Sequence, residues 1–149
     1  MKKFKFPLDT VLDYKHQVLS SLQTEHGAIL AQLRRQEEIL EALENQYYQA
    51  DQQFTRRKME GMNIADALSF EQYLRAMEHK LNQENRRLLQ IMEQEEAKRR
   101  EVVSAKQDTS SIEKLRERKL ELYRKEVQRS EELAIEDFVS TTRVLASQM

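Results

Sequence analysis

The chain has 149 residues, of which 34% are charged and only 7% aromatic, with one Pro, two Gly and no Cys. A formal net charge of -1 excludes a global electrostatic attraction to nucleic acid or to an anionic membrane, and the lack of Cys excludes disulfides, thiolate metal sites and Cys nucleophiles. This cysteine usage fits a reducing cytoplasm, and the scarcity of turn residues favours long helices with few connections.

The first predicted element is a helix over residues 7–60. The basic start of the chain contains no apolar run typical of a signal peptide or a membrane span, so we expect a soluble protein. Pro7 suits the first helical position, and Gly61 suits the end of the helix. Between them, seam positions recur every three or four residues, the heptad spacing of a coiled-coil helix: Leu12, Lys15, Leu19, Leu22, His26, Ile29, Leu33, Gln36, Leu40, Leu43, Tyr47, Ala50 and Phe54.

A connector over residues 61–69 is predicted next, because Ser69 and Gln72 have the spacing of a capping box that starts a helix. The second helix then spans residues 70–147. Its seam has the same spacing: Phe70, Leu74, Met77, Leu81, Glu84, Leu88, Ile91, Glu95, Lys98, Val102, Ala105, Thr109 and Ile112. The continuation through Arg116, Leu120, Tyr123, Val127, Ser130, Ala134 and Phe138 contains a stutter. With a second capping-box pattern at residues 110–113, the stutter predicts a kink or register shift near residues 108–112.

Two heptad helices with a short connector must run antiparallel, so the fold class is all-α: one coiled-coil hairpin domain over residues 1–149. Centring the turn near residues 62–67 places Phe54 near Met77, Leu12 near residues 116–119, and Gln36 near Glu95. The second helix is longer, and its last ~20 residues should extend by ~30 Å without a partner within the chain.

Basic and acidic residues are segregated near the predicted end of the hairpin that contains the chain termini. Residues 114–129 contain seven basic and three acidic side chains, Lys2, Lys3 and Lys5 lie at the same predicted end, and an acidic step follows at Glu131, Glu132, Glu136 and Asp137. The Arg-Arg pairs elsewhere are interleaved with Glu, which is typical of a solvated face with ion pairs. A nucleic-acid groove is the weaker reading, because no basic stripe with interleaved aromatics occurs.

Little in the sequence favours catalysis. His16, His26 and His79 lack the Glu-x-x-His pairing of di-iron bundles, no Gly-rich phosphate loop occurs, and a two-helix rod offers no dry pocket. We therefore expect a non-enzymatic protein without a metal or another cofactor. Large side chains gather near the turn instead, where Tyr48 and Tyr73 lie off the seam and are candidate protein-contact residues.

Three stretches, in this order, resemble the FliJ family of bacterial flagellar export proteins. They are Phe4 to Tyr14 (FKFPLDTVLDY), Gly61 followed by Phe70-Glu-Gln-Tyr-Leu74, and residues 112–119 (IEKLRERK) with Tyr123 and residues 131–137. The likeness spans essentially the whole chain. It implies a coiled-coil component of the flagellar type III export apparatus, similar to the gamma-subunit stalk of rotary ATPases. It places the protein in the cytoplasm, peripheral to the inner face of the membrane at the flagellar base.

The resemblance also implies partners: a hexameric export ATPase, the cytoplasmic domain of the export-gate membrane protein, and export chaperones, with neither nucleic acid nor membrane insertion. Carried to this sequence, the ATPase-ring-binding residues are Phe4, Phe6, Arg116, Arg118, Lys119 and Tyr123. The export-gate-binding residues are Tyr47, Tyr48, Tyr73 and Met77. Two other functions stay open, namely a free-standing coiled-coil chaperone that holds clients on apolar ends, and a rod associated with nucleic acid.

Overall fold

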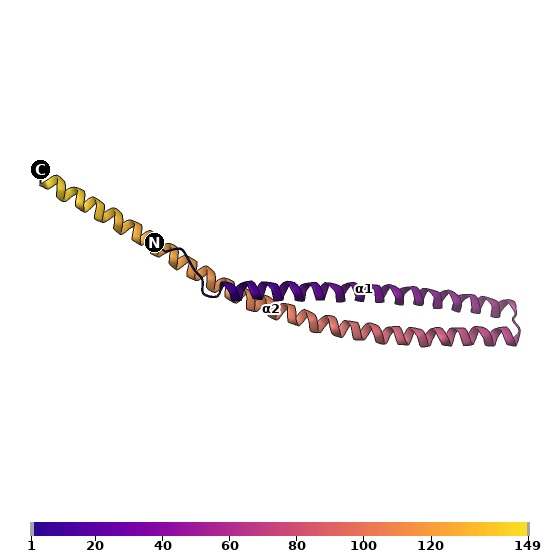
Figure 1. The fold of residues 1–149 in the computed structure, drawn as a ribbon. Helices are drawn as coiled ribbons and strands as arrows, with labels where there is room; N and C mark the ends of the chain where they lie inside the picture. The colour runs from indigo at the N-terminus through magenta and orange to yellow at the C-terminus, as the bar shows by residue number, and fades with distance from the viewer. Residues whose placement is uncertain (1, 149) are drawn as a thin grey trace. The chain divides into compact units, whose positions relative to one another are not determined.

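The computed structural model describes residues 2–148, in which the chain forms two α-helices (Figure 1). Helix α1 spans Asp9–Glu60 and has 52 residues, and helix α2 spans Ile64–Ser147 and has 84 residues. The two helices form two compact units. The hairpin unit contains residues 20–103, and the terminal unit contains residues 1–19 and 104–149. The predicted all-α class is therefore confirmed.

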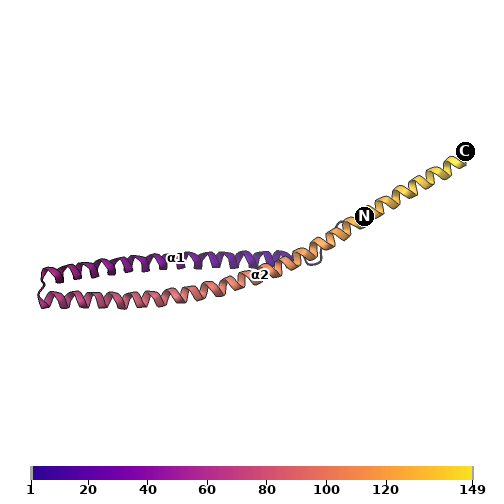
Figure 2. The same ribbon diagram turned by 180° about the vertical axis from the view of Figure 1, so that it is seen from behind.

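In the hairpin unit, α1 and α2 lie side by side and run antiparallel through a short connector (Figures 1 and 2). Gly61 adopts φ = 99°, the left-handed conformation that ends α1 without a steric penalty. Asn63 then caps α2, because its Oδ1 accepts a hydrogen bond from the Asp66 backbone N–H at 2.8 Å. Arg57 and Lys58 in the last turn of α1 complement the negative end of the helix dipole.

The start of α2 differs from the prediction. The helix begins at Ile64 rather than at residue 70, so Ser69 lies inside the helix. The Asn63 cap satisfies the backbone N–H of Asp66 six residues earlier than the Ser69 capping box would have acted. The connector is correspondingly shorter, and this changes which residues of the two helices face each other.

The predicted register is therefore wrong within the hairpin unit. Phe54 stacks on Phe70 with ring centroids 5.3 Å apart, instead of facing Met77. The Gln36 side chain donates hydrogen bonds to the Glu84 carboxylate and to the Glu84 backbone carbonyl, the latter at 3.0 Å, instead of meeting Glu95. A turn that closes earlier brings earlier residues of α2 opposite each position of α1.

The predicted seams are confirmed by exposure. All thirteen seam positions of α1 and all thirteen of α2 from Phe70 to Ile112 are buried or half-buried. Polar residues of the seam contact polar residues of the other helix. Nε2 of His26 lies 3.0 Å from Oε1 of Glu95, and the Lys98 ammonium donates a hydrogen bond to Glu25 at 2.8 Å. The core is thus a narrow strip of apolar side chains, interrupted by layers in which polar side chains of the two helices bind each other.

In the terminal unit, α2 continues without interruption through residues 108–112. The hydroxyls of Thr109 and Ser111 donate to backbone carbonyls one turn earlier, at 2.7 and 2.9 Å, so this stretch does not start a new helix. The half-buried positions shift at this point, as the stutter predicts, since Arg116 and Leu120 follow Ile112 at steps of four. Leu12 and Arg116 line one shallow hollow, which agrees with their predicted proximity.

Candidate functional site

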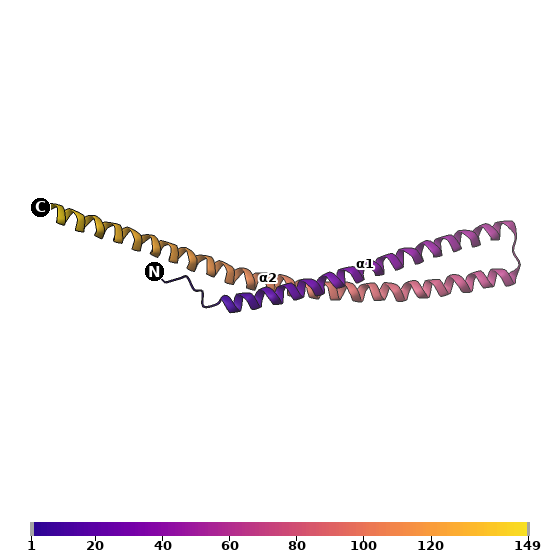
Figure 3. The same ribbon diagram turned by 45° about the horizontal axis from the view of Figure 1, so that its top comes forward.

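An extended N-terminal arm, residues 2–8, packs on α2 in the terminal unit (Figure 3). The rings of Phe4 and Tyr123 lie 5.5 Å apart at 47°. The Tyr123 hydroxyl also donates a hydrogen bond to the backbone carbonyl of Lys2 at 2.6 Å. The Asp9 backbone N–H donates to the Phe6 carbonyl at 3.1 Å, which forms the turn from the arm into α1. The arm therefore has a defined position against Tyr123.

Arg116 joins the arm, α1 and α2. Its guanidinium carbon lies 5.5 Å from the centroid of the Phe4 ring, and its Nε donates to Oδ1 of Asp9 at 3.0 Å. Stacking against an aromatic face suits the planar, weakly hydrated guanidinium. Phe4, Arg116 and Tyr123 are thus brought together, but by contacts within the chain.

The six residues predicted for the ATPase ring separate into two groups. Phe4, Arg116 and Tyr123 are half-buried and Phe6 is buried, so these four hold the terminal unit together. Arg118 and Lys119 are exposed on α2. They are the two of the six that face solvent and can present charge directly to a partner.

The N-terminal arm borders a hollow on the terminal unit. Its lining residues are Lys2, Lys3, Phe4, Lys5, Tyr123 and Glu126. Three ammonium groups and one carboxylate give this hollow a positive balance, with two aromatic rings as its apolar part. Such a surface is chemically suited to an acidic or aromatic segment of a protein.

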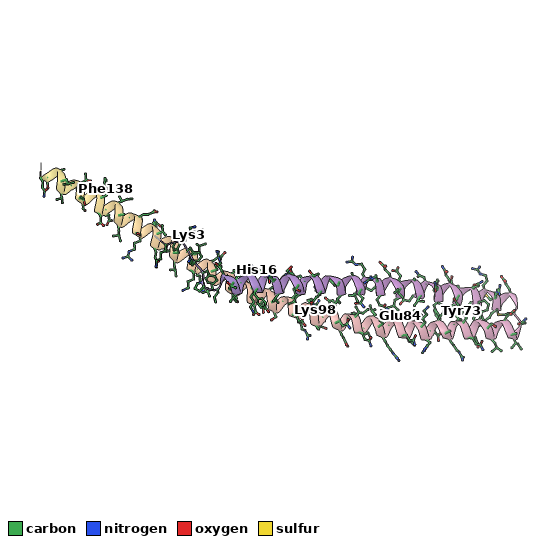
Figure 4. All side chains as sticks on the ribbon, in the orientation of Figure 1. Lys3, His16, Tyr73, Glu84, Lys98 and Phe138 are labelled. Atoms are coloured by element: carbon green, nitrogen blue, oxygen red, sulfur yellow. The ribbon has the colours of Figure 1, made fainter. Side chains whose placement is uncertain are left out.

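The end of α2 beyond the arm is exposed throughout. Every side chain from Gln128 to Gln148 is exposed, including large apolar ones: Leu133, Ile135, Phe138, Val139, Val144 and Leu145. Figure 4 shows Phe138, 73% exposed, on a part of α2 that has no described segment beside it. The predicted unpaired amphipathic extension is thereby confirmed for the terminal unit. Helices of this kind gain most of their stability by docking an apolar face on a partner.

The residues predicted for the export gate lie in the hairpin unit but do not form one surface. The hydroxyl of half-buried Tyr47 donates to Oε1 of Glu78 at 2.6 Å, and Met77 is only 7% exposed in the core. Tyr48 and Tyr73 are 62% and 53% exposed. Tyr73, labelled in Figure 4, lines a hollow together with Phe70. Tyr48 and Tyr73 are therefore the two available for contact.

The hydrogen bond to Glu78 raises the pKa of Tyr47 above its ordinary value. Smaller contributions come from partial burial and from the negative charges of Glu78 and Asp51, all of which disfavour the tyrosinate. The pKa of Lys98 is also raised, because its ammonium donates hydrogen bonds to Glu25 and Glu101. Both shifts favour the protonated side chains, which are the hydrogen-bond donors of these contacts.

Exposed apolar residues at the turn were missed by the sequence analysis. Met59 and Ile64 are 85% and 81% exposed, and Leu68 lies one turn after Ile64 on α2. The available signal was their position, because all three are large apolar residues off the seam and Met59 and Ile64 flank Gly61. Near them, the ammonium of Lys58 lies 3.8 Å from the ring centroid of Phe54.

The histidines and carboxylates of residues 2–148 do not form a metal-ion cluster. The described side chains contain no group of three or more His, Cys, Asp or Glu residues placed to hold a metal ion. Nε2 of His16 lies 2.7 Å from Oε1 of Glu113, and the His79 ring contacts Gln83 one turn away, so these two histidines have neighbours on the helices themselves. Neither helix, over the described residues, contains a stretch long and apolar enough to cross a membrane.

Comparison with known protein families assigns the chain to a family. A family profile described as Flagellar FliJ protein matches residues 4–143. Comparisons with curated proteins and with solved structures gave no significant match. The matched range contains both helices almost completely, the N-terminal arm from Phe4 onward, and most of the exposed extension. The chain therefore belongs to the FliJ family and is a component of the flagellar type III protein export apparatus.

Proposed function

We propose that this protein is the central stalk of the flagellar export ATPase, a role similar to that of the gamma subunit in rotary ATPases. The terminal unit binds the hexameric ATPase ring and promotes its activity, and the turn of the hairpin unit binds the cytoplasmic domain of the export-gate membrane protein. The protein is itself non-catalytic, and it works in the cytoplasm at the inner face of the membrane, at the base of the flagellum.

The observation that carries the proposal is the exposed extension of α2 from Gln128 to Gln148. An amphipathic helix of this length needs a partner for Phe138 and its apolar neighbours, and a ring interior can surround a single helix on all sides. Arg118 and Lys119 add exposed positive charge before the extension begins. Exposed charge of this kind accelerates association with an oppositely charged surface.

The structure sharpens the choice of test variants. Arg118→Glu/Lys119→Glu changes only exposed residues of the terminal unit, whereas a change at Arg116 would also break the pair with Asp9. Tyr48→Ala/Tyr73→Ala likewise changes exposed residues near the turn, whereas a change at Met77 would open a cavity in the core.

The experiment measures ATPase stimulation and gate binding for both variants. We expect the Arg118/Lys119 variant to lose at least tenfold in apparent affinity for the ring and to bind the gate normally, with the reverse for the tyrosine variant. Arg86→Glu/Arg87→Glu is the matched charge control, because both residues are exposed in the hairpin unit. Equal effects of both variants on both partners would refute the division of labour.

A chaperone that works without the ring is the second candidate, and one observation favours it. The exposed apolar side chains around Phe138 could hold unfolded export clients without strict sequence demand. The two functions differ in a simple assay. A holdase suppresses aggregation of export substrates in the absence of the ATPase, and Phe138→Ser weakens this suppression. A stalk changes the rate of ATP hydrolysis and leaves client aggregation unaffected. Binding to export chaperones is expected for either function.

A further inference from the structure

One face of α2 in the terminal unit, which includes part of the extension assigned above to the ring, has an exposed apolar stripe. Leu115, Leu122, Leu133 and Val144 are all exposed, and they are separated by seven, eleven and eleven residues. Both spacings are close to a whole number of helical turns, so the four side chains form one apolar stripe along the helix. This stripe lies about a quarter of a turn from the face of Arg116 and Tyr123, which the N-terminal arm covers.

A hollow lies on the stripe. Its lining residues are Glu126, Arg129, Ser130, Leu133, Ala134 and Asp137. The small side chains of Ser130 and Ala134 follow each other by one helical turn and leave room for another helix to approach closely. Leu133 supplies apolar area, and charges of both signs surround it.

When two copies of the stripe run in opposite directions, acidic residues of one copy face basic residues of the other. When two copies of the helix lie antiparallel with the two-fold axis between residues 127 and 128, Leu122 of each copy faces Leu133 of the other. Glu126 then faces Arg129, and Lys119 comes opposite Asp137. A two-fold axis produces each contact twice, so one surface supplies both halves of the interface. A parallel arrangement would instead set Glu126 against Glu126 and Arg129 against Arg129.

We propose that the exposed stripe of α2 binds a second copy of this chain, forming an antiparallel helix pair across residues 115–140. The contact leaves the Phe4–Tyr123 pair in place, because that pair lies on a different face, and Glu126 borders both surfaces. The interface is small, which places it among transient assemblies. The inference does not depend on binding to the ATPase ring. The dimer would cover apolar residues of the stripe while the protein is not bound to the export apparatus.

The test uses charge reversal in two complementary variants of the full chain. Glu126→Arg/Asp137→Lys makes the stripe positive, and Lys119→Glu/Arg129→Glu makes it negative. All four residues are exposed, so neither variant should affect the folding of the hairpin. Sedimentation equilibrium at low salt should show a reversible dimer of the unmodified chain, with a Kd of about 1 to 100 µM. Each variant alone should be monomeric, and an equimolar mixture should restore the dimer.

Glu117→Lys/Glu131→Lys is the matched control. It produces the same change in net charge as the positive variant, on residues about half a turn away from the stripe. It should therefore dimerise like the unmodified chain. Dimers that persist in both reversed variants, or an unmodified chain that stays monomeric up to about 1 mM, would overturn the proposal.

Cysteine cross-linking tests the direction of pairing, and the chain has no native Cys to interfere. Under mild oxidation, Leu122→Cys/Leu133→Cys should form disulfide-linked dimers, because these positions face each other between antiparallel copies. Leu122→Cys alone should give few. Efficient cross-linking of Leu122→Cys alone would indicate a parallel pair and contradict the proposed interface.

Discussion

The hydroxyl of Tyr47 on α1 donates a hydrogen bond to Oε1 of Glu78 on α2 at 2.6 Å. This bond raises the pKa of Tyr47 above its unfolded value of about 10. A raised pKa in the folded state means that the bond contributes its full stability below pH 10 and loses it as the pH rises through the folded value. We therefore expect the free energy of unfolding to fall more steeply above pH 10 in the unmodified chain than in Tyr47→Phe.

Urea unfolding followed by circular dichroism, repeated between pH 8 and pH 11, measures this difference. Lys98 also has a raised pKa, so its contribution to the free energy of unfolding falls in the same pH direction. This contribution is the same in both proteins and cancels when their pH profiles are compared. Glu78→Gln serves as the control, because it removes the charge that disfavours the tyrosinate. Identical pH profiles for Tyr47→Phe and the unmodified chain would show that the bond does not form in solution.

The polar layer at Gln36 gives a second prediction. Gln36 is 3% exposed and donates to Glu84, so Gln36→Ala leaves Glu84 without this partner and creates a cavity. We expect a loss of about 1–3 kcal/mol in the free energy of unfolding. The double variant Gln36→Leu/Glu84→Leu replaces the layer with apolar packing and should unfold with equal or higher stability. A double variant less stable than Gln36→Ala would contradict this account of the layer.

Replacing glycine by alanine should change the stability of the chain in opposite directions at its two glycine positions. Gly27 lies inside α1, and a Cβ built there meets nothing within 4 Å, so Gly27→Ala should stabilise the chain by roughly 0.5–1 kcal/mol. Gly61 also has space, but its φ of 99° is unfavourable for a side chain, so Gly61→Ala should destabilise the chain by about 1 kcal/mol or more. Thermal unfolding of both variants checks the signs, and stabilisation by Gly61→Ala would show that the turn adopts another conformation.

The docked N-terminal arm predicts a local effect at Tyr123. Tyr123→Phe removes the bond to the Lys2 carbonyl and keeps the ring beside Phe4, whereas Tyr123→Ala removes both contacts. Trypsin cleavage after Lys3 and Lys5 should accelerate modestly in the first variant and strongly in the second. Tyr14→Phe is the control, since Tyr14 is an exposed residue of the same unit. Equal cleavage rates in all four proteins would indicate that the arm is not held by Tyr123.

Heptad spacing was sufficient to identify both helices and their buried faces, because apolar periodicity determines which side of a helix avoids water. It did not determine the register. The position of Phe54 opposite Phe70 depends on where the connector ends, and Asn63 and Ser69 are both acceptable helix caps. Only the packing of the whole hairpin selects between them.

The sequence predicts candidate contact residues near the chain termini and near the turn, and the structure shows which of them are exposed. The sequence did not show that Arg116 pairs with Asp9 or that Met77 belongs to the core, because these roles depend on contacts between distant segments. Met59 and Ile64 lie off the heptad seam, so periodicity does not distinguish them from other surface residues, and their exposure depends on how the turn closes.

Helix α2 belongs to both compact units and is hydrogen-bonded from Ile64 to Ser147. Each turn of an α-helix is fixed to the next by backbone hydrogen bonds. The change of buried face near Thr109 is therefore accommodated within regular helix, without a loop or a second helix start.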